Sequence, residues 1–337
     1  MYADIPMWLS LVFMFGGLAL LAWSSDLFVD GAAAVAKTLG ISPFIIGMVI
    51  IGFGTSAPEL CVSAMSGMSG HSDLSLGNAY GSCIFNIAVI IGVAVMIFPL
   101  VVKPSVTFVA GPLLGGIAAF SLWILRDGIC SRTEAIILLA AFAVILPFYC
   151  WYDQGEVKSK SEKVKSKDEK VKSEEETSES IWTALVKLAV GLGVLVASSH
   201  YLVWGAVDFA KWAGVSDLVI GLTIVAAGTS LPELASAIQS ARKGEHEFVL
   251  GNIIGSNLFN TLAVVGIATA IAPAENFSHY ILTRDLPLMI ALSFSITLFG
   301  INWKHPKWPG VIRKGEALLW IAIFVGYTLL MLYQETR

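Results

Sequence analysis

Long apolar segments recur along the whole chain and leave few ways for it to fold. Ten of them have about the length, 17 to 25 residues, that a helix needs to cross the hydrocarbon core of a bilayer. They cover residues 7–27, 42–66, 76–98, 106–125, 133–152, 182–205, 218–241, 247–271, 282–301 and 315–333. Backbone groups left unpaired in lipid are costly, so such segments cross as helices. The sequence therefore predicts an all-α polytopic membrane protein with ten transmembrane helices.

A repeat relates the two ends of the chain. Residues 54–60 read Gly-Thr-Ser-Ala-Pro-Glu-Leu, and residues 228–234 repeat six of these seven positions at an offset of 174. At the same offset, the segment from Gly77 to Asn86 overlies the segment from Gly251 to Asn260. A constant offset over this distance indicates duplication. With five predicted helices in each copy, the second copy enters the membrane from the opposite side, which is the inverted-repeat plan of many secondary transporters.

Charge is concentrated between the two repeats. The chain of 337 residues is only 14% charged, yet 16 of its charged residues lie between Asp153 and Ser180. Lysines and acids alternate there, which favours a solvated linker over a nucleic-acid-binding patch. We therefore expect a first five-helix repeat over 1–152, a charged cytoplasmic linker over 153–180 and a second five-helix repeat over 181–337.

The distribution of Lys and Arg predicts the orientation. With the N-terminus outside, 16 of the 21 basic residues face the cytoplasm and five face out. This asymmetry favours a multi-pass protein of the cell membrane with both termini outside. The four cysteines show no Cys-x-x-Cys spacing and no pairing with His, which favours small, buried apolar side chains. We expect no cofactor apart from the transported ions.

The repeated motifs carry polar groups into predicted membrane helices. Thr55 lies four residues before Glu59, and Thr229 lies four residues before Glu233, so each pair shares one helix face. Pro58, like its counterpart in the second repeat, removes a backbone donor and weakens the helix beside the glutamate. A carboxylate at the bilayer centre costs at least about 2.5 kcal/mol, which makes a functional role more plausible than a structural one.

The following helix of each repeat adds hydroxyl and amide groups. Ser82 with Asn86 and Ser256 with Asn260 are spaced four residues apart. A purely structural alternative for these four residues is hydrogen bonding between helices. If the repeats converge at the midplane, two carboxylates, several hydroxyls and two amides make an all-oxygen shell suited to a hard cation such as calcium or sodium. The glycines four apart, Gly77 with Gly81 and Gly251 with Gly255, predict close packing against a neighbouring helix.

The paired motifs resemble the alpha-repeats of the sodium/calcium exchanger family in the cation/calcium antiporter superfamily. The resemblance covers both repeats and implies alternating access, with the first and sixth helices sliding across a core of eight. It implies calcium ligands at Thr55, Glu59, Thr229 and Glu233, and sodium-site or lining residues at Gly52, Ser56, Ser82, Asn86, Ala226 (through its carbonyl), Ser230, Ser256 and Asn260. Several family members have Asp where this chain has Asn260, so the expected centre has two carboxylates instead of three.

Sodium-driven calcium antiport is thus the preferred function, with transported calcium and sodium ions and the lipid bilayer as the only partners predicted. A proton/calcium antiporter of the same fold is the alternative, because two glutamates could exchange two protons for one calcium ion. Relatives of that kind carry a Gly-Asn-x-x-Glu type motif, unlike this chain. An intramembrane hydrolase is disfavoured because no Ser/His or Cys/His pairing falls in the motifs. A passive channel is a further alternative. The pattern predicts no enzyme, and it predicts neither exchange stoichiometry nor oligomeric state.

Overall fold

The structure, a computed structural model, describes residues 6–165, 180–214, 226–275 and 277–335. Within them, eight helices are long and apolar enough to cross a membrane. A bent pair, Pro43–Thr55 and Ala57–Met68, makes a ninth crossing if its two parts, which meet at 43°, form one span. The predicted segment 218–241 begins outside the described residues. The prediction of a helical, multi-pass membrane protein is confirmed.

The first part of the chain contains five groups of helical elements. They are α1 (Met7–Leu39); α2 (Pro43–Ile46), η1 (Gly47–Ile51), α3 (Gly52–Thr55) and α4 (Ala57–Met68); α5 (Ser72–Phe85), η2 (Asn86–Ile91) and α6 (Gly92–Ile97); η3 (Val106–Ala110), α7 (Gly111–Ile124) and η4 (Leu125–Asp127); and α8 (Arg132–Lys165). Strands β1 (Leu100–Val102) and β2 (Ile129–Cys130) lie in the connections.

The second part follows the same order where it is described. Its elements are α9 (Ile181–Trp212); α11 (Ala226–Gly228) and α12 (Leu231–Arg242); α13 (His246–Leu258), η6 (Phe259–Val264) and α14 (Val265–Ile271); η7 (Ile281–Asp285) and α15 (Leu286–Gly300); and α16 (Lys314–Glu335). Strands β3 (Ala274–Glu275) and β4 (Gly310–Ile312) again occupy connections.

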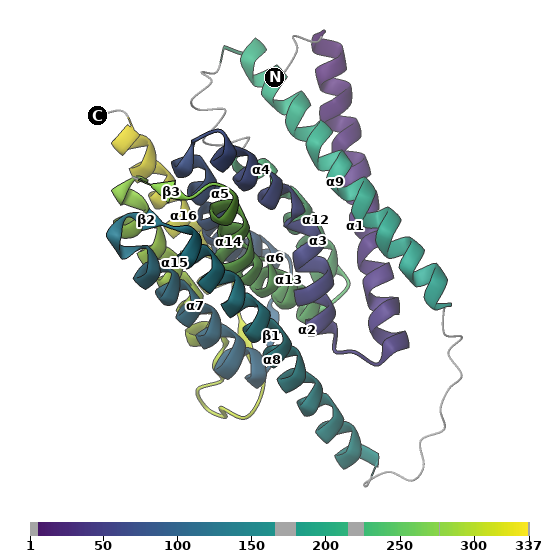
Figure 1. Ribbon diagram of the computed structural model, residues 1–337. Helices are drawn as coiled ribbons and strands as arrows, with labels where there is room; N and C mark the ends of the chain where they lie inside the picture. Colours follow the sequence, from purple (N-terminus) through teal and green to yellow (C-terminus); the bar gives the residue numbers. More distant parts are fainter. Residues whose placement is uncertain (1–5, 166–179, 215–225, 276, 336–337) are drawn as a thin grey trace.

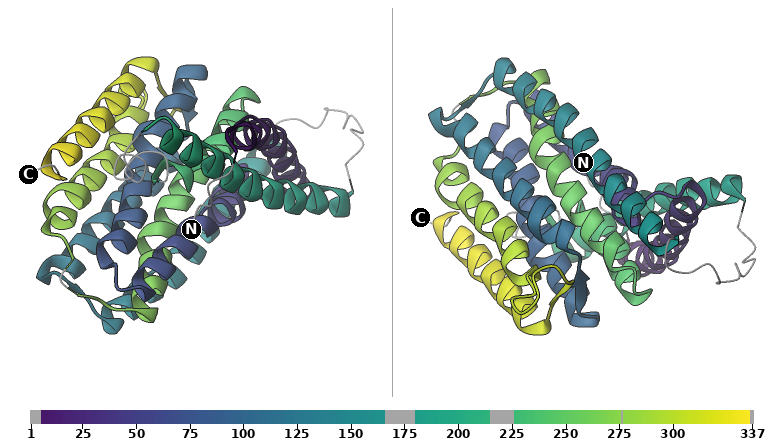
Figure 2. Two further views of the ribbon diagram at one scale, coloured as in Figure 1. Left: turned by 90° about the horizontal axis from the view of Figure 1, so that it is seen from above. Right: turned by 90° about the horizontal axis from the view of Figure 1, so that it is seen from below.

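Helices α1 and α9 form an antiparallel pair at one side of the molecule, and α16 lies at the opposite edge (Figure 1, Figure 2). Glycines allow the pair to pack backbone to backbone. A Cβ at Gly17 would stand 2.9 Å from the Leu202 nitrogen, and one at Gly31 would stand 2.5 Å from the Leu188 nitrogen. Neither glycine therefore tolerates a side chain without a shift of the helices.

The innermost layer is α13, whose residues from Phe248 to Leu258 are all buried. Close packing against α2 and η1 explains why this helix carries glycine at two positions. A Cβ at Gly251 would stand 2.4 Å from the Phe44 oxygen, and one at Gly255 would stand 2.2 Å from the Met48 oxygen. The predicted close approach is thus confirmed here, whereas no described residue lies within 4 Å of a Cβ position at Gly77 or Gly81.

Two short antiparallel strand pairs connect the first part of the chain to the second. Strand β1 pairs with β4, with Val101 opposite Val311. Strand β2 pairs with β3, with Cys130 opposite Ala274. Strands of two or three residues give no alternating pattern in sequence, and the apolar segments did not predict them.

Three helices extend farthest beyond the predicted apolar segments. Helix α1 runs to Leu39 instead of residue 27, and it ends at Gly40, which has a left-handed φ of 62°. Helix α9 runs to Trp212 instead of residue 205. Helix α8 continues to Lys165, so the first part of the expected linker 153–180 is helical, while residues 166–179 lie outside the described ranges. Hydropathy locates the apolar part of a helix, whereas its end is set by capping geometry.

Candidate functional site at two helix breaks

The two repeated Gly-Thr-Ser-x-Pro-Glu motifs form breaks between helices. Helix α3 ends at Thr55, and Ser56 leaves the helical conformation with φ −84° and ψ 5° before α4 begins. Ser230 has a similar geometry, φ −92° and ψ 10°, before α12. Each motif proline falls in the first turn of the new helix, where its missing N–H leaves no bond unmade. The predicted weakening of the helices is confirmed.

The breaks place both glutamates in the first turn of a helix. Glu59 is the third residue of α4 and Glu233 is the third residue of α12, where the helix dipole favours a negative charge. Both side chains have 0% exposure. Each motif therefore places one completely buried carboxyl group beside its helix break.

The two motifs exchange hydrogen bonds. The Ser56 hydroxyl donates to Glu233 Oε1 at 3.0 Å, and the Ser230 hydroxyl donates to Glu59 Oε1 at 3.0 Å. Thr55 likewise lies beside Glu233, and Thr229 lies beside Glu59. This reciprocal arrangement is the contact pattern that a two-fold axis produces. The structure thus brings together the six most central residues of the sequence-based prediction.

Two asparagines that the prediction left unassigned hold the glutamate backbones. Asn78 Nδ2 donates to the Glu59 carbonyl oxygen at 3.1 Å, and Asn252 Nδ2 donates to the Glu233 carbonyl oxygen at 3.4 Å. Both residues directly follow the motif glycines Gly77 and Gly251. Their repetition at the offset of 174 was the signal that could have identified them.

The remaining predicted residues lie mostly on the core helices beside the breaks. The Ser256 hydroxyl donates to the Gly52 carbonyl oxygen at 3.2 Å, which joins two predicted positions directly. Ser82 is buried in α5. Ala226 is the first residue of α11, and its side chain lies outside the described set.

The two predicted amides begin or adjoin π-helical turns. Asn86 is the first residue of η2, and Asn260 is the second residue of η6. Both are completely buried. Single π-helical turns inside helices occur frequently at functional sites. The Asn86 Nδ2 donates to Asn257 Oδ1 at 2.9 Å, a contact that the prediction did not foresee.

Several buried oxygen atoms in this region have no hydrogen-bond partner among the described residues. They are Glu59 Oε2, Thr229 Oγ1, Glu233 Oε2, Asn86 Oδ1 and Asn260 Oδ1. Buried polar groups are normally paired, so such atoms need an explanation. All five belong to residues of the predicted ion site, and all can coordinate a hard cation. Within the described ranges, no group of three or more His, Cys, Asp or Glu side chains could hold a metal, so this region offers two carboxylates at most.

A separate ion cluster connects α12 to α1. Lys243, which follows α12, lies 2.6 Å from Asp26 Oδ1 and 2.6 Å from Asp30 Oδ1. Gln239 also donates to Asp26. Burial alone would lower the pKa of Lys243, but the hydrogen bonds and the negative charges of Asp26 and Asp30 together outweigh that effect and raise the pKa. The two aspartates are about half exposed, so this cluster lies away from the buried glutamates.

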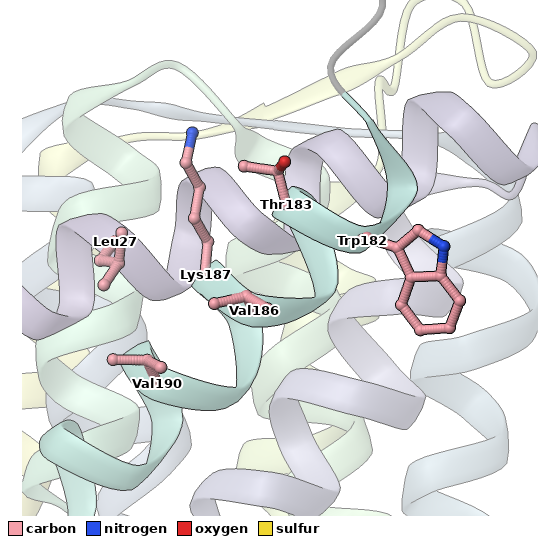
Figure 3. Close-up of a pocket in the computed structure, with 6 residues that line it drawn as sticks. All are labelled: Leu27, Trp182, Thr183, Val186, Lys187 and Val190. Atoms are coloured by element: carbon pink, nitrogen blue, oxygen red, sulfur yellow. The ribbon is translucent and has the colours of Figure 1, made fainter.

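One hollow of the described surface is lined by none of the motif residues. It holds about 420 Å³ and lies between α1 and α9 (Figure 3). Its lining is Leu27, Trp182, Thr183, Val186, Lys187 and Val190. A shallow, mostly apolar hollow of this kind on a membrane helix pair suits lipid contact better than ion binding.

Comparison with known proteins agrees with this geometry. The family model described as "Sodium/calcium exchanger protein" matches residues 9–151 and 183–333. The putative antiporter CaxA of Alkalimonas amylolytica is 38% identical over 320 residues, which is 95% of this chain and 98% of that protein. The sodium/calcium exchanger MaX1 of Methanosarcina acetivorans is 31% identical over 325 residues, 88% of this chain and 93% of that protein.

Solved structures agree as well. The sodium-calcium exchanger NCX_Mj, soaked with 10 mM Na+ and 10 mM Sr2+, superposes with a TM-score of 0.77 at 28% identity. The match covers 95% of this chain and 97% of that one. The family is one of membrane antiporters that transport ions. From its family match, its relatives and its fold, this chain belongs to the sodium/calcium exchanger protein family.

Proposed function

We propose that the protein is a sodium-driven calcium antiporter of the cell membrane, and that calcium binds between Glu59 and Glu233. One observation carries the proposal: two completely buried carboxylates exchange serine hydroxyls across the two motifs, and each keeps one oxygen without a described partner. Calcium takes six to eight oxygen ligands and is well served by carboxylates. One calcium ion would neutralise the two glutamates.

The other predicted residues complete the shell in this proposal. Thr55 and Thr229 add hydroxyls to the calcium site. The positions that bind sodium or line the shared cation site are Gly52, Ser56, Ser82, Asn86, Ala226, Ser230, Ser256 and Asn260. Three sodium ions would leave one excess positive charge beside two glutamates, which is unfavourable in a low-dielectric setting. Exchange of one cation type for the other therefore depends on electrostatic balance at a single centre.

We further propose a ten-helix architecture of two inverted five-helix repeats, 1–152 and 181–337, with a cytoplasmic linker at 153–180 and both termini outside. The reciprocal contacts across the offset of 174 support the inverted relation. In this scheme the pair α1 and α9 slides across the core to expose the site to either side. A C-terminal reporter that folds only outside the cytoplasm tests the orientation, and a silent reporter on a well-expressed protein would contradict it.

Counter-transport in proteoliposomes tests the function. Vesicles loaded with sodium and diluted into sodium-free medium should accumulate calcium-45, with the voltage clamped by potassium and valinomycin. A sodium ionophore should abolish the uptake, and a pH gradient without sodium should not replace it. Uptake driven by the pH gradient alone would identify the proton-coupled alternative, which two buried glutamates can also serve. Calcium flux that needs neither gradient would indicate a channel, and no calcium flux would refute calcium transport.

A further inference from the structure

Asn257 links α13 to α5 and η2 through two hydrogen bonds. The equivalent position of the first repeat is Cys83, so the two repeats differ here. Asn257 lies in α13 and is completely buried. Its Nδ2 donates to the Cys83 carbonyl oxygen at 3.1 Å, and its Oδ1 accepts from Asn86 Nδ2 at 2.9 Å. The residue therefore bridges the end of α5 and the beginning of η2.

This chain of contacts fixes which way the Asn86 amide faces. A backbone carbonyl oxygen can only accept, so the Asn257 atom that meets Cys83 must be the amide nitrogen. The other Asn257 atom is then the oxygen, and its neighbour on Asn86 must be a nitrogen. Asn86 Oδ1 consequently points the other way, and it has no hydrogen-bond partner among the described residues. One backbone carbonyl thus determines the orientation of two side chains in series.

The equivalent amide of the second repeat has no such support. At the offset of 174, Asn260 corresponds to Asn86 and Cys83 corresponds to Asn257. The Cys83 thiol lies 3.7 Å from the Asn257 carbonyl oxygen and 3.6 Å from Thr261 Oγ1. A thiol is a weak donor and acceptor and cannot replace an amide in both roles. Among the described residues, neither amide atom of Asn260 has a partner.

We propose that Asn257 is a positioning residue that presents Asn86 Oδ1 as a permanently oriented oxygen to the transported cation, whereas Asn260 is free to reorient. The proposal rests on the proposed function, because it assigns a task within that ion site. An amide turned the wrong way would aim N–H groups at a cation, which repels them. Holding Asn86 removes this possibility before the ion arrives, as residues behind metal ligands do in other sites.

Equilibrium binding of calcium-45 to the purified protein tests the proposal separately from the coupling ion. Asn257→Leu keeps the shape of the side chain but breaks both bonds, and we expect it to weaken calcium binding about 10- to 100-fold, as loss of an outer-shell partner typically does. Cys83→Ala changes the equivalent position of the other repeat, keeps the Cys83 carbonyl and should bind like the wild type. Asn257→Cys is a smaller change, and it replaces Asn257→Leu if that variant does not fold.

A double-mutant cycle separates positioning from a merely structural role. In an Asn86→Ala background, Asn257→Leu or Asn257→Cys should add little further loss, because the residue acts through Asn86. An equal loss in both backgrounds, or no loss in either, would overturn the proposal. Calcium binding that responds as expected without sodium-driven transport would refute only the sodium coupling. A wild-type protein that binds no calcium would refute both.

Discussion

The two motif regions of this exchanger are alike at their carboxylates and different at their amides. Glu59 and Glu233 are equally buried, lie in the first turns of equivalent helices and accept equivalent serine hydroxyls from each other's motif. Asn86 is held by Asn257, whereas Asn260 faces no described partner. The two repeats therefore keep the carboxylates and their hydroxyl partners alike, whereas the residue beside each amide differs, Asn257 in one case and Cys83 in the other. The following variants test how far the likeness extends.

The largest effect should come from removing either carboxylate. Glu59→Gln and Glu233→Gln should each reduce sodium-driven calcium uptake to background, because calcium loses a charge that replaces its hydration shell. Calcium-45 flux in proteoliposomes measures this, with Glu134→Gln as a control because Glu134 only caps the start of α8. If one variant kept near wild-type transport, the two glutamates would not be equivalent and the calcium site would be wrongly assigned.

The same substitution at the two amides should have unequal effects. Asn86→Asp would set a carboxylate oxygen against Asn257 Oδ1, which now accepts at 2.9 Å, and we expect half-saturation by calcium to rise about 100-fold. Asn260→Asp meets no described acceptor, so exchange should persist. Its carboxyl resembles the amide when protonated and adds a third negative charge when ionised, which introduces a new pH dependence.

Rates of the two amide variants at clamped voltage between about pH 5 and 9 check this prediction. Equal losses of exchange rate in both variants would contradict the proposed difference between the two amides. If Asn260→Asp were indistinguishable from the wild type over that whole range, residue 260 would not belong to the ion site.

A smaller and symmetrical effect is expected for the crossed serines. Ser56→Ala and Ser230→Ala each remove a hydrogen bond to a buried carboxyl group, and such bonds contribute about 1.5 to 3 kcal/mol. Half-saturation by sodium or calcium should therefore shift at least about tenfold, and by similar factors in both variants. Ser69→Ala, at an exposed hydroxyl, provides a control. Markedly different shifts would show that the reciprocal contacts are not functionally equivalent.

The smallest effect should follow deletion of residues 158–178. The segment is expected only to connect the two repeats, and a shorter solvated connection should still join them. Calcium uptake per molecule should stay near the wild-type rate. A large loss at normal expression would show that the segment regulates one repeat or docks on it.

Most of the helical architecture was predictable because the length of the apolar segments and the pairing of backbone groups in lipid determine it. The positions at which the helices end were not predictable. From hydropathy we predicted that the first span ends near Asp26 and Asp30, but helix α1 continues through both residues. Their carboxylates are paired with Lys243 and Gln239, which lie on or beside α12. That partner lies more than 200 positions away in sequence, and no local pattern reveals it.

The candidate site was predictable wherever the repeat preserved it. Glu59, Glu233 and their serines were found because both copies carry the same motif at one offset. Asn257 was missed because its counterpart is Cys83, so comparison of the copies gave no signal. Its role depends on the direction of two hydrogen bonds, which only three-dimensional placement provides.

The crossed hydrogen bonds also bear on how the protein is made. Ser230 follows Glu59 by 171 residues, and a ribosome adding about 5 to 20 residues per second needs roughly 9 to 34 s to reach it. During that interval the early helices carry a glutamate whose hydroxyl partner has not been synthesised. Any insertion factor that shields Glu59 therefore acts within this window, and slow codons between the two motifs would lengthen it.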